Sequence, residues 1–251
     1  MALLCVPLAL QAESEVRVAI PQVDPWGYVD EQGNPAGMLM ELLQELNKAT
    51  DLELVYYLRP LSRALLELER GEVDYSIAFE SPRVNEIATP VRELVALRVL
   101  ALGPVQEDAR ASPRSLDDLT GRPVGYIRGT YYGATFNRHE GIVRVPVQDM
   151  RQGLELVHRG RLDAMIGSDM AMAGAYEAMP EEERPALNIL FELEPARGMF
   201  YRSNQGPDNT TDGLLKNALE QLERSGRLSE IFSPRLRSEG KTPGRWVVEP
   251  H

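Results

Sequence analysis

Apolar positions in the first third of the chain follow two periods, and this predicts strands separated by helices. Short stretches alternate as half-buried strands do, and longer stretches between them carry leucines at helical spacing. The strands are predicted at 16–20, 52–57 and 73–79, and the helices at 38–49 and 60–70. Arg70-Gly71 ends the second helix, since glycine is a natural C-terminal cap. A β-α-β-α-β order is typical of a parallel sheet wrapped by helices.

The same order recurs downstream. Leu65, Arg70, Gly71, Asp74 and Ile77 recur with the same spacing as Leu154, Arg159, Gly160, Asp163 and Ile166. The flanking pattern also repeats, with strands predicted at 124–127 and 142–145 and a helix from near Tyr131. Two such units predict two sheets, whose strand ends would meet at a common cleft where open α/β sheets bind ligands.

Three groups of residues at predicted strand ends are candidates for that cleft. The strand at 124–127 stops at Arg128-Gly129-Thr130 before a helix, which is either an anion-binding cradle or an ordinary helix cap. Glu80 and Asp169 leave the third strand of their units at the same point. Asp74 and Asp163 lie at the opposite strand ends, where a turn or strand-entry role is expected.

A long apolar segment between the units predicts how the chain crosses. Residues 94–102 form an unbroken apolar run apart from one arginine, predicted as one long buried strand, and 199–201 would bring the chain back. A helical segment at 212–232 is expected to return to the first lobe. The predicted divisions are a leader at 1–12, a first lobe at 13–96 and 198–236, a second lobe at 97–197, and a loosely held tail at 237–251.

The composition narrows the function classes. A chain of 251 residues with 43% hydrophobic content can bury a sizeable core, and a net charge of -11 argues against nucleic-acid or anionic-membrane surfaces. With three histidines and the single Cys5, spacing supports neither a metal site nor a disulfide framework. The sequence has no nucleophile elbow, P-loop or dinucleotide fingerprint. We therefore expect a binding protein without cofactor or metal rather than an enzyme.

The first residues predict export. Residues 3–10 are apolar but too short to span a bilayer, and Gln11-Ala12 follows them. This is typical of a shortened signal peptide cleaved after Ala12, with a frayed apolar tail as the alternative. Export would place the protein in the periplasm, and cleavage would remove Cys5 and leave a mature protein without cysteine.

These patterns together resemble the bacterial extracellular solute-binding proteins of family 3, the periplasmic receptors of polar amino acid ABC importers. The resemblance runs from residue 15 to about 236 and is carried by residues 24–37, 70–74, 81–83, 115–130 and 160–164. It implies a periplasmic-binding-protein type II fold, with two α/β lobes of mainly parallel sheet joined by two crossing strands. It also implies an amino acid-like small-molecule ligand and a membrane permease as partners, and we expect a monomer that binds no nucleic acid.

The resemblance further implies roles for individual residues. Arg83 would hold a ligand carboxylate together with Gly129 and Thr130, and Asp169 would take an α-ammonium. The segment from Asp74 to Arg83 is shorter than in typical amino acid receptors, so other polar contacts are also expected. The predicted ligand-binding set is Trp26, Tyr28, Phe79, Glu80, Arg83, Arg128, Gly129, Thr130, Tyr131 and Asp169.

Two alternatives stay open at this point. Some dehydratases of prephenate-type acids resemble these receptors and need one acidic group in the cleft, which Glu80 or Asp169 could supply. A ligand-sensing domain that reports to a membrane kinase is the other alternative, since a partner surface leaves no visible motif.

Overall fold

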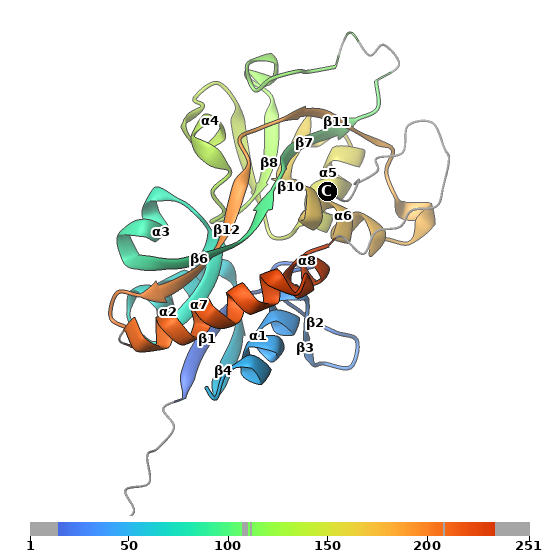
Figure 1. Ribbon diagram of the computed structural model, residues 1–251. Coiled ribbons are helices and arrows are strands. Elements are labelled where there is room, and N and C mark those ends of the chain that lie inside the picture. The colour runs from blue at the N-terminus through green and yellow to red at the C-terminus, as the bar shows by residue number, and fades with distance from the viewer. Residues whose placement is uncertain (1–14, 107–109, 111, 208, 234–251) are drawn as a thin grey trace, which may run out of the picture.

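The computed structural model describes residues 15–106, 110, 112–207 and 209–233. The predicted leader with Cys5 and the predicted tail at 237–251 lie outside these residues. The described residues form two five-stranded sheets and a small two-stranded one. Figure 1 shows the two large sheets as separate lobes, one above the other in this view. The predicted α/β fold of two lobes is confirmed.

The first sheet holds the strands of the first predicted unit. Its order is β4-β1-β5-β12-β6, with β1 parallel to β4 and β5, and β12 antiparallel to β5 and β6. The strands are β1 Val16–Pro21, β4 Leu54–Arg59, β5 Tyr75–Phe79, β6 Ala88–Leu97 and β12 Ala196–Ser203. A two-stranded hairpin, β2 Tyr28–Val29 with β3 Pro35–Ala36, lies in the segment that follows β1.

Five helices belong to the first lobe: α1 Met38–Ala49, α2 Leu61–Glu69, α3 Pro82–Ile87, α7 Asn209–Arg224 and α8 Arg227–Ile231. The leucines that predicted α1 are its buried face. The helical segment predicted at 212–232 consists of two helices, α7 and α8. Gly226 separates them with φ of 80°, a left-handed conformation that an α-helix cannot contain.

The second sheet repeats the pattern with strands from the middle of the chain. Its order is β11-β7-β10-β8-β9, in which β8 is parallel to β9 and β10, and β7 is antiparallel to β10 and β11. The strands are β7 Val99–Pro104, β8 Pro123–Ile127, β9 Val143–Val147, β10 Ala164–Ser168 and β11 Leu187–Glu192. The helices are α4 Gly133–Arg138, α5 Met150–His158 and α6 Asp169–Glu177, with single 3-10 turns at Asp117–Leu119 and Glu181–Glu183.

The two aspartates of the internal repeat, Asp74 and Asp163, make equivalent contacts in the two lobes. Asp74 donates its N–H to Arg17 O at 2.8 Å, and its Oδ1 lies 2.8 Å from Arg17 Nη2. Asp163 donates its N–H to Pro123 O at 2.9 Å, and its Oδ1 lies 3.4 Å from Arg122 Nη1. Each aspartate therefore fastens the start of the third strand of its unit to the first, which is the expected strand-entry role.

The chain crosses between the sheets at two adjacent points. The prediction of one unbroken strand at 94–102 is wrong, because β6 ends in the first sheet and β7 begins in the second, with Arg98 between them. The ladder breaks at the crossing, since β6 pairs with β12 in the first sheet and β7 pairs with β10 and β11 in the second. Leu193 N–H donates to Val99 O at 2.8 Å, and Arg98 Nη2 lies 3.0 Å from Glu192 Oε2. These contacts tie the outgoing and returning segments together.

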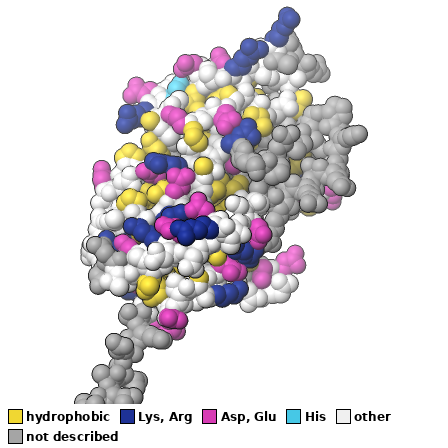
Figure 2. Space-filling view, viewed as in Figure 1, with side chains coloured by type: hydrophobic (Ala, Val, Ile, Leu, Met, Phe, Trp, Pro, Cys, Tyr) yellow, Lys and Arg dark blue, Asp and Glu magenta, His cyan; other side chains and the backbone are white. Residues whose placement is uncertain are grey.

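Charges of both signs mix on the surface. Acidic and basic side chains alternate over the face seen in Figure 2. Ion pairs such as Arg92 with Glu220 at 3.3 Å and Arg227 with Glu41 at 2.6 Å join neighbouring helices and strands of the first lobe. Within the part of the chain that the structure describes, no helix is both long and apolar enough to cross a membrane.

Candidate functional site

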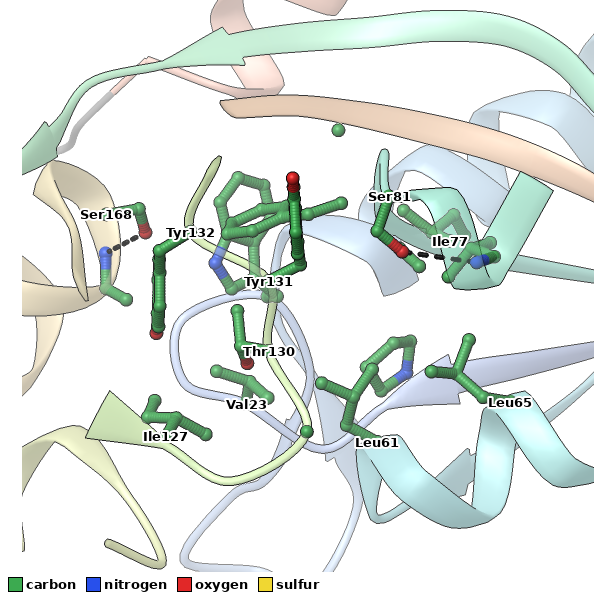
Figure 3. A pocket seen from close by; sticks show the side chains of 18 of the residues that line it. Val23, Leu61, Leu65, Ile77, Ser81, Ile127, Thr130, Tyr131, Tyr132 and Ser168 are labelled. Carbon is green, nitrogen blue, oxygen red and sulfur yellow. Dashed lines mark hydrogen bonds between the residues drawn. The ribbon is translucent and has the colours of Figure 1, made fainter. Parts of the chain in front are cut away.

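A pocket of about 480 Å³ lies between the two lobes and takes its wall from both. The first lobe contributes the loop after β1, the face of α2, the end of β5 and the start of α3. The second lobe contributes the end of β8, the loop that follows it, and the junction of β10 with α6. These are the strand ends at which the internal repeat predicted a common cleft, and Figure 3 shows the pocket from close by.

Aromatic rings form a chain across the pocket from one lobe to the other. The rings of Trp26 and Phe79 meet edge to face with centroids 6.4 Å apart, and Phe79 meets Tyr132 of the second lobe, also at 6.4 Å. Phe232 packs on the other side of Trp26 at 5.9 Å. Burial raises the pKa of the Tyr132 phenol well above its usual value, against hydrogen bonds with Thr130 and the Ile127 backbone, so the ring stays neutral.

Aliphatic side chains complete most of the wall. Leu61 and Leu65 project from α2 on one side of the pocket, and Val23, Thr130 and Ile127 lie to their left in this view (Figure 3). Both leucines are only partly buried, although they face a pocket rather than bulk solvent. The sequence places them on one face of α2 at helical spacing, which alone does not tell a core face from a pocket face.

Two serines place buried hydroxyl groups at the pocket, one from each lobe. Ser81 caps α3 and accepts a hydrogen bond from Val84 N–H at 3.2 Å, and Ser168 caps α6 and accepts one from Ala171 N–H at 3.3 Å. They are only 6% and 1% exposed. In Figure 3 they lie on opposite sides of Tyr131 and Tyr132.

The loop after β8 differs from its prediction. The helix expected from Tyr131 begins at Gly133, because Thr130 N–H turns back to Ile127 O at 3.2 Å and Tyr132 N–H donates to Asn137 Oδ1 at 2.9 Å. Thr135 N–H, in the first turn of α4, donates to Glu194 Oε1 at 3.0 Å. This helix start therefore binds a carboxylate of the chain itself, while Gly129 and Thr130 of the preceding loop line the pocket.

Six residues of the predicted set line the pocket: Trp26, Phe79, Arg83, Gly129, Thr130 and Tyr131. The structure does not bring the other four to its wall. Tyr28 is exposed in β2, and Arg128 is exposed beyond β8. Glu80 forms an ion pair with Arg197 in a neighbouring cavity of about 270 Å³. Asp169 is 6% exposed, and its Oδ1 accepts Met170 N–H of its own helix at 2.8 Å.

Arg83 stands at the mouth of the pocket with its guanidinium already paired. Its Nη2 lies 2.8 Å from both carboxylate oxygens of Glu69, at the end of α2. The Arg83 side chain is 63% exposed. A ligand carboxylate that reaches Arg83 would share this guanidinium with Glu69 or replace Glu69.

Several lining residues were absent from the predicted set: Leu61, Leu65, Ser81, Tyr132, Asn137 and Ser168. Ser81 and Ser168 carry a usable signal, since a serine between a predicted strand and helix is a preferred N-cap at the cleft edge. Tyr132 and Asn137 carry none, because their direction depends on where α4 begins. Among the residues that the structure describes, no cluster of histidine, cysteine or carboxylate side chains could hold a metal ion.

Comparisons with known proteins agree with this geometry. No family model matches the chain. The chain is 23% identical over 221 residues to the "Amino-acid-binding protein AabA" of Dichelobacter nodosus, covering 84% of this chain and 83% of that one. Its fold is similar to a mutant of ArgBP from T. maritima, with TM-score 0.72, 20% identity and coverage of 86% of this chain and 93% of that one.

A second solved structure with this fold is a histidine kinase sensor domain with similarity to periplasmic binding proteins. It gives TM-score 0.73 and 17% identity over 86% of this chain and 93% of that chain. The fold is that of the type II periplasmic-binding-protein class. The predicted resemblance to extracellular solute-binding proteins of family 3 is confirmed by these similarities.

Proposed function

We propose that this protein is a periplasmic solute-binding protein. It captures a small ligand, an amino acid or a related carboxylate, in the pocket between the lobes and delivers it to the permease of an ABC importer. The observation that carries the proposal is that both lobes build the wall, with Phe79 of the first facing Tyr132 of the second. The similarity to an amino-acid-binding protein supports the ligand class.

The proposed mechanism follows from this shared wall. A ligand that contacts both lobes gains all of its contacts only when the lobes are close together, so binding favours the closed arrangement. The segments at Arg98 and Leu193 are the places where the chain can bend, since the sheets themselves are continuous on either side. The permease would then recognise the closed shape.

The dehydratase alternative calls for an acidic side chain in the cleft. The described lining contains no aspartate or glutamate, and Glu80 and Asp169 lie outside it. We therefore propose binding without chemistry. The test is to incubate the protein with a ligand and identify by mass spectrometry what is recovered. The ligand should come back unchanged, and a dehydrated product would establish the enzyme instead.

A thermal-shift screen against amino acids and small carboxylates tests the binding proposal directly. A ligand present at about 100 times its dissociation constant adds about 2.7 kcal/mol of stability, enough for a clear shift in Tm. Isothermal calorimetry on each hit should then give one site per chain. If no amino acid and no carboxylate shifts Tm, the proposal is wrong.

The sensor alternative has one observation in its favour, the similarity in fold to the histidine kinase sensor domain and to the BvgS domains of B. pertussis. Uptake of radiolabelled ligand distinguishes the two. Proteoliposomes that contain the importer's permease and ATPase should accumulate ligand only when this protein is present. Failure of uptake with a ligand that binds would favour sensing.

A further inference from the structure

Resting on the proposed function, we propose that the ligand of this pocket is an aryl or branched alkyl monocarboxylate without an α-ammonium group. The class is typified by 3-phenylpropanoate, which is L-phenylalanine without its amino group. The inference joins three features of the pocket: its apolar wall, its buried hydrogen-bond donors, and the absence of acidic side chains from its described lining.

The apolar wall of the pocket indicates that the main part of the ligand is apolar. Trp26, Phe79 and Tyr132 offer ring faces and edges, and Leu61 and Leu65 close the side formed by α2. Along this part of the wall, a polar side chain such as a guanidinium or an amide would lose its water against rings and leucines that cannot replace its hydrogen bonds. An aromatic or branched apolar group would instead cover the partly exposed leucines and remove them from water.

The buried hydroxyl groups indicate which polar group the ligand carries. Ser81 Oγ and Ser168 Oγ each accept a hydrogen bond from the first turn of the helix that they cap. Within the described part of the chain, neither hydroxyl donates a hydrogen bond, so each O–H remains available to an acceptor. The Asn137 amide is similar, since its Oδ1 takes Tyr132 N–H and its NH₂ group can donate. Such donors suit carboxylate oxygens.

The acidic side chains near the pocket already have partners within the protein. Glu69 pairs with Arg83, Glu80 pairs with Arg197, and Asp169 accepts an N–H of its own helix. An α-ammonium group carried into this pocket would therefore lose its hydration without meeting a carboxylate at the wall, which is costly. A carboxylate would meet Arg83 at the mouth or one of the two serine hydroxyls, which lie on opposite sides of Tyr131 and Tyr132.

Calorimetry on the full chain tests the inference with three probes that share a phenyl ring. We expect 3-phenylpropanoate to bind at least tenfold more tightly than L-phenylalanine, and 3-phenylpropan-1-ol, which lacks the carboxylate, to bind more weakly than 3-phenylpropanoate. Tighter binding of L-phenylalanine, L-glutamine or L-arginine would overturn the inference and leave the proposed function standing. If no carboxylate and no amino acid binds, both are wrong.

A matched pair of variants at Ser168 tests the head group. Ser168→Asp and Ser168→Asn have the same shape and both keep a side-chain oxygen for the α6 cap. Only the asparagine keeps a donor, and the aspartate adds a negative charge. We expect 3-phenylpropanoate to bind Ser168→Asp at least tenfold more weakly than Ser168→Asn, and 2-phenylethylamine to show the opposite order.

Equal affinity of the two Ser168 variants for 3-phenylpropanoate would overturn the inference. Circular dichroism spectra that match the parent establish that both variants are folded. If either Ser168 variant does not fold, the same pair of substitutions at Ser81 makes the comparison from the first lobe, with the same expected order.

Discussion

Arg83 and Glu69 form a competing pair at the mouth of the pocket. Because Glu69 holds the guanidinium through both of its oxygens, a ligand carboxylate meets a charge that is already neutralised. The exposure of the Arg83 side chain, 63%, means that water also screens this interaction. Arg83 therefore contributes less to binding than a buried arginine would.

We predict that Arg83→Ala weakens binding of a carboxylate ligand by about 1 to 2 kcal/mol, which is the range for hydrogen bonds to charged groups reduced for screening by water. Glu69→Gln should act in the opposite direction, because it releases the guanidinium to the ligand. Arg83→Lys keeps the charge and should lie between the alanine variant and the parent. Calorimetry on the four proteins gives the order, and unchanged affinity in both Arg83→Ala and Glu69→Gln would remove Arg83 from the site.

Glu67 fastens α2, which carries two pocket leucines, to the end of β4. Its Oε1 lies 2.6 Å from Arg63 Nε and 3.1 Å from Arg59 Nε. Burial alone would raise the pKa of the Glu67 carboxyl, but the hydrogen bonds from Arg63 and Arg59 outweigh it, and the pKa lies below its ordinary value. The ionised form is thus favoured by folding.

This direction gives a pH dependence of stability. A carboxyl whose pKa is lower in the folded state stabilises it above the unfolded pKa of about 4.3, and the stabilisation is lost as pH falls through the folded pKa. Glu67→Gln should therefore flatten the acid side of the curve of unfolding free energy against pH, measured by urea titration from pH 3 to 6. Glu53→Gln, which removes a carboxylate at an exposed position, is the control variant.

The site residues fall into two groups, according to whether the sequence could predict that their side chains face the pocket. Phe79 could be predicted because it ends a strand of the first lobe, and strand ends are fixed by the pattern of that lobe alone. Trp26 and Arg83 are expected from the resemblance to the solute-binding proteins of family 3. Tyr132 faces the pocket because α4 begins at Gly133 and Tyr132 N–H donates to Asn137 Oδ1. No local pattern in the sequence encodes where that helix begins, so the role of Tyr132 could not be predicted from it.

Two helices of the internal repeat end at equivalent glycines. Comparing the two glycines separates the strain of a left-handed backbone from crowding around an added Cβ. Gly71 follows α2 with φ of 69°, and Gly160 follows α5 with φ of 64°. An added Cβ at Gly71 would lie 3.0 Å from Gln205 Cβ, whereas at Gly160 it would meet nothing within 4 Å. The first site has strain and crowding, and the second has strain only.

We predict that Gly160→Ala lowers the free energy of unfolding by about 1 to 2 kcal/mol, the cost of a left-handed conformation for a residue with a Cβ. Gly71→Ala should cost more, because Gln205 must also move. Urea denaturation of both variants beside the parent measures the difference. Equal losses of unfolding free energy in the two variants would show that the segment around Gln205 moves away from the added Cβ at no cost in free energy.

At the scale of elements, hydrophobic periodicity predicted a helix that has one buried and one exposed face, and it missed a helix that is buried on nearly all sides. α1 has a clear buried stripe and matches its predicted bounds. α6 is buried on nearly all sides, at Met170, Ala171, Met172, Ala173 and Ala175, because it lies between its own sheet and the first lobe. A helix without an exposed face has no amphipathic period to detect. The break at Arg98 was missed for a related reason, since the apolar pattern continues across it.

In the whole molecule, the two lobes meet at the pocket and also beside it. Pro25, in the loop after β1, packs against Gly174 of α6, where a Cβ added to the glycine would lie 3.1 Å from Pro25 Cδ. The Asp24–Pro25 peptide bond is cis. Neither Pro25 nor Gly174 is among the pocket-lining residues. This contact therefore reports on the approach of the lobes without touching the ligand.

A larger side chain at Gly174 should act as a wedge between the lobes. We predict that Gly174→Leu leaves both lobes folded but weakens ligand binding roughly tenfold, about 1.4 kcal/mol, because the closed arrangement must now displace Pro25. Small-angle scattering should show the parent compacting when ligand is added, and the variant compacting less. Gly213→Leu in α7 is the matched control, since an added Cβ there meets nothing within 4 Å. A parent that does not compact, or a Gly174→Leu variant that binds like the parent, would mean that the pocket binds without closure of the lobes.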